Sequence, residues 1–148
     1  MFPAKPGRRA TSADDATSSR RRPSDAEYER LLAVRVQLRT FDRWSREAAA
    51  VEGLTHAQHQ LLLAVRGHPG TEGPTVGDAA EALLVAPHTA SGLVDRTQAL
   101  GLLDRERDAE DSRRVRLHLT PRGEQVLSQL TVVHLEELRR LAPVLGVL

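Results

Sequence analysis

Four arginines and no acidic residue occur between residues 112 and 122: Arg113, Arg114, Arg116 and Arg122. The stretch Arg114–Leu119 alternates polar and apolar side chains, which is typical of a half-buried β-strand. Together with Leu102–Arg107 it predicts a hairpin on which Arg114, Arg116 and His118 face outward. A cationic hairpin can enter the minor groove of DNA, where the potential is negative. We therefore interpret these arginines as groups that bind DNA, with a solvated charged face as the alternative.

A second candidate surface for binding nucleic acid lies between Pro87 and Leu100. Proline at the first helical position and Gly101 after the last turn predict a helix here. The apolar spacing places Thr97 on the inner stripe, where its hydroxyl needs an acceptor such as the carbonyl four residues earlier. Such a helix can approach base edges in the major groove if its outer face is small and polar. That face carries His88, Thr89, Ser91, Gly92, Asp95 and Arg96.

Helix-capping signals mark the elements that must hold these two surfaces. Three pairs of residues have the spacing of a capping box: Ser24 and Glu27, Thr55 and Gln58, and Thr75 and Asp78. They predict a long helix up to Gly53, a second helix before a loop at residues 67–74, and a short third helix. After the hairpin, Thr120 and Pro121 open a last helix, which Pro143 is expected to bend or end. This order predicts a mainly α fold with a small β-hairpin wing, a winged helix-turn-helix.

The composition narrows the class of protein further. The chain has 148 residues, of which 40% are hydrophobic and 28% charged, and this suits one domain with a buried core. The absence of cysteine excludes a disulfide scaffold, a cysteine-bound metal and a thiol redox sensor. No apolar run approaches the length of a membrane span, and no apolar segment of a secretory signal follows the basic start. We therefore expect a cytoplasmic protein with no membrane partner.

The first 24 residues differ from the rest of the chain. They are rich in Pro, Gly, Ser, Thr and Ala, and they hold six basic and two acidic residues. We predict a disordered basic tail at residues 1–24, which is either a solvated leader or an arm that touches DNA phosphates. Because the net charge of the whole chain is only +1, any argument for nucleic-acid binding must rest on local surfaces.

Several histidines and a tryptophan are candidates for other chemistry. His56 and His59 have a spacing that can hold a metal, but no HExxH motif accompanies them, so we predict solvated or capping histidines and assign no metal site. His134 is predicted to be an interface histidine with its hydrogen bonds satisfied. Trp44 and His59 are candidates for a ligand pocket, with core packing as the alternative for Trp44. No nucleophile elbow, phosphate loop or paired-carboxylate motif is present, so we expect neither an enzyme nor a cofactor.

The chain resembles the MarR family of winged helix-turn-helix regulators over roughly residues 25–145. Three stretches carry the resemblance: Thr75–Glu81 with Leu93–Arg96, Gly101–Leu103 with Arg107–Arg113, and Leu119–Gly123. The most specific signal is Asp-x-Arg at Asp111 and Arg113, followed by Leu-Thr-x-x-Gly. The sequence departs from the family at Ala86, where a capping serine is common, and at Thr97, where leucine is usual.

The resemblance implies a homodimeric transcription factor, usually a repressor, which binds a pseudo-palindromic operator in double-stranded DNA and is often released by a small-molecule effector. Residues 25–52 and 121–148 would be dimerisation helices, and residues 54–119 would be the DNA-binding lobe. Arg113 and Arg114 would enter the minor groove, with Asp111 orienting a wing arginine. The recognition-helix positions would be His88, Thr89, Ser91, Gly92 and Arg96. The alternatives are a winged-helix module that binds protein instead of DNA and, with less support, a small enzyme.

Overall fold

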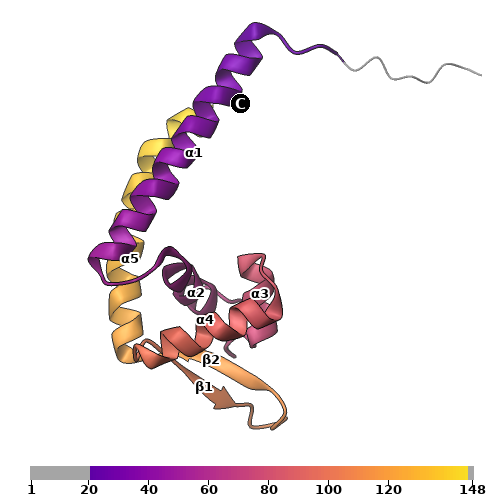
Figure 1. Ribbon diagram of the computed structural model, residues 1–148, viewed down its shortest axis with the longest axis vertical. Helices are drawn as coiled ribbons and strands as arrows, with labels where there is room; N and C mark the ends of the chain where they lie inside the picture. The colour runs from indigo at the N-terminus through magenta and orange to yellow at the C-terminus, as the bar shows by residue number, and fades with distance from the viewer. Residues whose placement is uncertain (1–20, 147–148) are drawn as a thin grey trace, which may run out of the picture.

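The computed structural model describes residues 21–146, so residues 1–20 of the predicted basic tail and residues 147–148 lie outside the described part of the chain. Within this part the elements follow the predicted order. They are α1 (Asp25–Val51), α2 (His56–Arg66), α3 (Val76–Leu83), α4 (Pro87–Ala99), β1 (Leu103–Arg107), β2 (Val115–Leu119) and α5 (Pro121–Leu145). Figure 1 shows α1 and most of α5 rising side by side from a lobe that contains the other elements. The mainly α fold with a hairpin is confirmed.

Local hydrogen bonds explain where the helices begin. The caps of α1, α2 and α3 are complete capping boxes, in which the side chains of Ser24, Thr55 and Thr75 accept from the backbone three residues later. At the start of α5, Thr120 accepts from the backbone of Gly123. The helix α4 has no side-chain cap, because Ala86 occupies that position and only Pro87 favours the helical start.

The turn between α3 and α4 contains an unusual backbone conformation. Leu84 caps α3 in the left-handed region, with φ of 56° and ψ of 42°. Its side chain is 93% exposed, so no burial compensates for the strain of placing a leucine there. Glycine is the residue that ordinarily adopts this conformation at a helix C-terminus.

The core lies where α2 meets the other elements of the lobe and the first half of α5. Leu61 and Leu62 of α2 are fully buried, together with Leu103 and Leu117 of the hairpin. Thr97 is also fully buried, and its hydroxyl donates to the carbonyl of Leu93 at 2.7 Å. This confirms the acceptor predicted for Thr97 four residues earlier in the helix.

The two strands pair antiparallel, with Leu103 opposite Leu119 and Arg107 opposite Val115. On its other side, β2 bonds to the loop before α3, because the N–H of Leu117 donates to the carbonyl of Pro74 at 2.8 Å. The hairpin is therefore held from both sides near its base, while residues 108–114 form its free end.

Pro143 does not end the last helix, which continues to Leu145. Proline removes one backbone hydrogen bond, and so close to the end of a helix that loss affects only the final turn. Within residues 21–146 we find no helix that is both long and apolar enough to cross a membrane.

Candidate nucleic-acid interface

The polar face of α4 comprises His88, Thr89, Ser91, Gly92, Asp95 and Arg96. The opposite side of the helix is anchored in the core by Ala90, Val94 and Thr97, which are fully buried. All six residues of the polar face are exposed or half-buried. The structure therefore places the predicted recognition residues together on the accessible side of α4.

The centre of the polar face has no projecting side chain at position 92, because this residue is glycine. A Cβ atom at position 92 would lie 3.4 Å from Nη1 of Arg96, so the arginine side chain lies across Gly92. Together with the missing side-chain cap at Ala86, this leaves the start of α4 open to an approaching ligand. The N–H groups in the first turn of a helix favour negatively charged groups.

The free end of the hairpin is organised by two aspartates. Asp108 accepts from the backbone N–H groups of Glu110, at 2.9 Å, and Asp111, at 3.4 Å. The first of these bonds is the main cause that lowers the pKa of Asp108. Asp111 in turn accepts from the backbone of Arg113 at 3.0 Å, and its Oδ2 lies 4.0 Å from Nε of Arg114. The wing thus has a defined shape.

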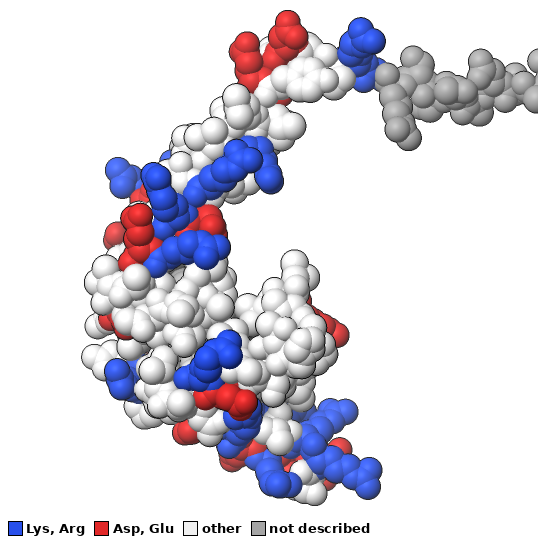
Figure 2. All heavy atoms as spheres, viewed as in Figure 1, with Lys and Arg blue, Asp and Glu red and all other residues white. Residues whose placement is uncertain are grey.

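Arg113 and Arg114 are both exposed at this end of the hairpin. Figure 2 shows basic side chains gathered at the same end of the molecule. No ion pair of Arg113 is found within the described residues, and Arg114 has only the long contact with Asp111. The two arginines that we predicted for the minor groove are therefore free to bind an external anion.

Arg116 differs from these two residues, and our expectation that it faces outward is wrong. Its side chain is only 15% exposed, with Nη2 at 3.1 Å from both Glu72 and Asp108. Its Nη1 also donates to the carbonyl of Gly73 at 3.2 Å. The loop before α3 folds against β2 and covers the outer side of this residue, which strand alternation alone cannot reveal.

Arg105 is a residue of the interface that the sequence analysis missed. It lies on β1, and its guanidinium reaches α4, where Nη2 donates to Oδ1 of Asp95 at 2.6 Å and Nη1 donates to Oε1 of Gln98 at 2.5 Å. The available signal was a lone acidic residue on the polar helix and an arginine in the following strand, but their contact depends on the fold.

A cavity of about 350 Å³ lies between α1, α2 and α5. His59 contributes to its wall, whereas Trp44, the other pocket candidate, packs beside the cavity with its ring centroid 4.8 Å from that of His134. Apolar walls come from α1, α2 and α5, and the polar groups come mainly from α1 and α2. The lining residues are Phe41, Asp42, Ser45, His56, His59, Gln60, Leu63, Thr131, His134, Leu135 and Leu138.

Three histidines meet at this cavity. Nδ1 of His134 lies 2.7 Å from the carbonyl of Leu130, so it must carry the proton, and Nε2 then accepts from the hydroxyl of Ser45 at 2.7 Å. The ring centroid of His59 lies 4.6 Å from that of His134. His134 therefore has the satisfied hydrogen bonds that were predicted for it.

His59 is not solvated, contrary to expectation, because α5 returns to cover it and leaves it 2% exposed. This burial, followed by the nearby charges of His134 and His56, lowers the pKa of His59 to about 4. Burial also lowers the pKa of His56, whose Nδ1 is buried without a hydrogen-bond partner. Across residues 21–146, no three His, Asp or Glu side chains are arranged to hold a metal ion.

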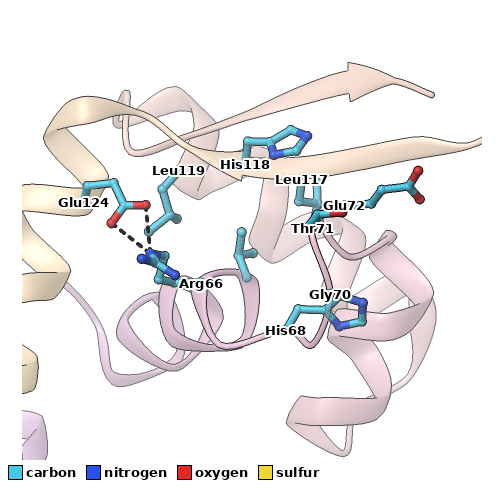
Figure 3. Close-up of a pocket in the computed structure, with 11 residues that line it drawn as sticks. Arg66, His68, Gly70, Thr71, Glu72, Leu117, His118, Leu119 and Glu124 are labelled. Carbon is cyan, nitrogen blue, oxygen red and sulfur yellow. Dashed lines mark hydrogen bonds and ion pairs between the residues drawn. The ribbon is translucent and has the colours of Figure 1, made fainter. Parts of the chain in front are cut away.

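A second cavity, of about 260 Å³, lies between α2, the loop at residues 67–74 and β2. Figure 3 shows Arg66 of α2 and Glu124 of α5 pointing at each other beside it. Their Nε and Oε1 atoms are 3.1 Å apart. This ion pair fastens the lobe to the base of α5 and lies apart from the polar face of α4.

The helix pair α3–α4, the hairpin and the following helix define the class of winged helix-turn-helix proteins. A family model described as MarR family matches residues 52–114, which span the lobe up to the end of the wing loop. Over this part of its length the chain is similar to the MarR family. This is a family of transcriptional regulators and not of enzymes.

Individual relatives agree with this assignment. An uncharacterised HTH-type transcriptional regulator, YsmB of Bacillus subtilis (strain 168), is 35% identical over 65 residues, which are 44% of this chain and 44% of that protein. The match thus spans less than half of the curated relative. A MarR family protein from Bacillus stearothermophilus is 27% identical, with a TM-score of 0.65 over 78% of this chain and 77% of that one. MepR of S. aureus in a DNA complex has the same fold, at 22% identity and a TM-score of 0.63 over 82% of this chain and 85% of that one.

Proposed function

We propose that the protein is a homodimeric transcriptional repressor that binds a pseudo-palindromic operator and responds to a small ligand. The observation that carries the proposal is the combination of an exposed polar face on α4 with two exposed arginines, Arg113 and Arg114, at the end of the wing. The first suits base edges in the major groove and the second suits the flanking minor groove. His88, Thr89, Ser91, Gly92 and Arg96 would read bases.

Exposed apolar side chains support a dimer. The long helices α1 and α5 leave the lobe together, and both present large hydrophobic residues to solvent in a single chain. Large apolar side chains exposed along two neighbouring helices indicate a protein interface. A second copy would cover it with the same surface, as two-fold symmetry requires. The residues are Tyr28, Leu31, Leu32, Val36 and Leu38 on α1, and Val132, Val133, Leu135, Leu138 and Leu145 on α5.

Such a dimer would place its two α4 helices in successive major grooves, about 34 Å apart. In this dimer the dimerisation helices would be residues 25–52 and 121–148, and the DNA-binding lobe would be residues 54–119. Asp111 would keep the wing in shape while Arg113 and Arg114 enter the minor groove.

The cavity between α1, α2 and α5 is the proposed effector site. It is large enough for a small organic molecule, for which pockets of roughly 300–1,000 Å³ are usual. It joins the proposed dimerisation helices to the lobe, so a ligand that prefers one arrangement of these parts would shift the spacing of the two α4 helices. His59 would contact the ligand, and Trp44 would hold His134 in place.

The test is binding to duplexes selected from a random-sequence pool by the wild-type protein. Replacing Arg113 and Arg114 with alanine should weaken binding and reduce the slope of log affinity against log salt by about one unit for each lost phosphate contact. The control replaces Arg66, an exposed arginine of α2 that pairs with Glu124 away from the polar face of α4, and should leave the slope unchanged. Failure of the wild-type protein to retain any duplex at low salt would refute the proposal and favour a protein-binding module.

A further inference from the structure

Asp95 places a negative charge in the middle of the surface that we propose for DNA. It is the only acidic residue of α4. It follows His88 by seven residues and Ser91 by four, and this spacing puts the three side chains on one side of a helix. Its side chain is 65% exposed. A bare carboxylate in this position would face the phosphates on both sides of a major groove.

Arg105 neutralises this carboxylate from outside the helix. Its Nη2 lies 2.6 Å from Oδ1 of Asp95, while its Nη1 donates to Gln98 one turn further along α4. The side chain of Arg105 is 29% exposed, and both terminal nitrogens of its guanidinium donate to side chains of α4. Arg96, the adjacent cation, lies across Gly92 and forms no ion pair with Asp95 among the described residues.

The same contact joins the two parts of the proposed reading surface. Arg105 belongs to β1, which pairs with β2 opposite Leu117, a residue buried in the core. The two hydrogen bonds from Arg105 to Asp95 and Gln98 therefore hold the hairpin against the side of α4. Sequence readout needs both elements to meet their grooves at once.

We propose that Arg105 is a positioning residue for DNA binding, which acts by cancelling the charge of Asp95 on the reading surface. The inference rests on the proposed DNA-binding function. Its main consequence is that removing Arg105 weakens DNA binding through the uncovered carboxylate of Asp95. Like charges brought together in an interface oppose binding strongly. Removing the carboxylate as well should restore most of the lost affinity for DNA.

The experiment compares Arg105→Gln, Asp95→Asn and the double variant on two probes, a duplex selected by the wild-type protein and an unselected mixed-sequence duplex. We expect Arg105→Gln to bind the selected duplex about tenfold more weakly, from the repulsion that it uncovers. Asp95→Asn should bind within threefold of wild type, and the double variant should recover to about the same level. The control is Arg66→Gln, which breaks the ion pair with Glu124 away from α4 and should bind like wild type.

A second variant separates charge from fold. Arg105→Lys loses the bond to Gln98 but keeps a positive charge beside Asp95, so it should bind within about threefold of wild type even if Arg105→Gln folds poorly. A loss that Asp95→Asn does not rescue would overturn the inference and indicate that Arg105 itself binds phosphate. A loss in Asp95→Asn alone would also overturn it and indicate that the carboxylate accepts from a cytosine amino group. If the wild-type protein binds neither probe, the proposed function fails along with it.

Discussion

Replacing Gly123 with alanine should destabilise the protein strongly, and the reason is a close approach of two backbones. Gly123 lies in the first turn of α5, in the Leu-Thr-x-x-Gly motif. An added Cβ would lie 1.9 Å from the carbonyl oxygen of Leu102 and 2.9 Å from its carbonyl carbon. Neither partner is the mobile end of a side chain, so α5 or the segment before β1 must move.

The contacts between the start of α5 and the segment before β1 set the size of this destabilisation. Thr120 donates through its N–H to Leu102 at 3.1 Å and through its hydroxyl to Gly101 at 2.7 Å, and it accepts from Gly123 at 3.0 Å. Overpacking of a well-packed site costs about 1–3 kcal/mol. Each weakened hydrogen bond adds about 1 kcal/mol. With one weakened hydrogen bond, we therefore expect Gly123→Ala to lower the free energy of unfolding by about 2–4 kcal/mol.

The assay is urea unfolding at one fixed protein concentration, followed by circular dichroism. The control is Gly77→Ala in α3, where an added Cβ meets only the Thr75 hydroxyl at an ordinary 3.7 Å. Because alanine favours a helix over glycine by about 1 kcal/mol, this variant should be as stable as wild type or slightly more stable. A Gly123→Ala protein that unfolds at the wild-type urea concentration would refute the crossing described here.

Two further predictions concern stability. Leu84→Gly should raise the free energy of unfolding by about 1 kcal/mol, because glycine relieves the left-handed strain and the exposed leucine buries nothing; a lower urea midpoint would contradict this. Acidification should destabilise the protein through His59, because its pKa is lowered to about 4 in the folded state from an ordinary value of 6.5. Between these two pKa values His59 is protonated in the unfolded chain but neutral in the folded chain. The free energy of unfolding therefore falls as the pH falls from about 6.5 to 4. His59→Leu should flatten that part of the pH profile, and an equally steep profile would show that another group is responsible.

Much of the fold could be predicted because the signals are local. Capping pairs such as Thr55 and Gln58 mark helix starts through bonds made within one turn. The hydroxyl of Thr97 has its acceptor on the same helix. The fold class and the exposed position of the α4 polar face followed from such patterns.

The parts that could not be predicted depend on residues distant in the chain. Arg116 appears outward-facing from strand alternation, but Glu72, 44 positions earlier, approaches it through a loop whose path the sequence does not reveal. His59 is buried by His134, which belongs to a helix that returns from the far side of the hairpin. The contact of Arg105 with Asp95 likewise needs the angle between β1 and α4.

The central claim is that two copies of the chain present two α4 helices to one face of DNA. Hydroxyl-radical footprinting on a duplex selected by the wild-type protein, with the mass of the same complex measured in solution, tests it most directly. The account predicts two chains per duplex and two protected half-sites centred about one helical turn apart. One chain per duplex, or a single protected site, would contradict it.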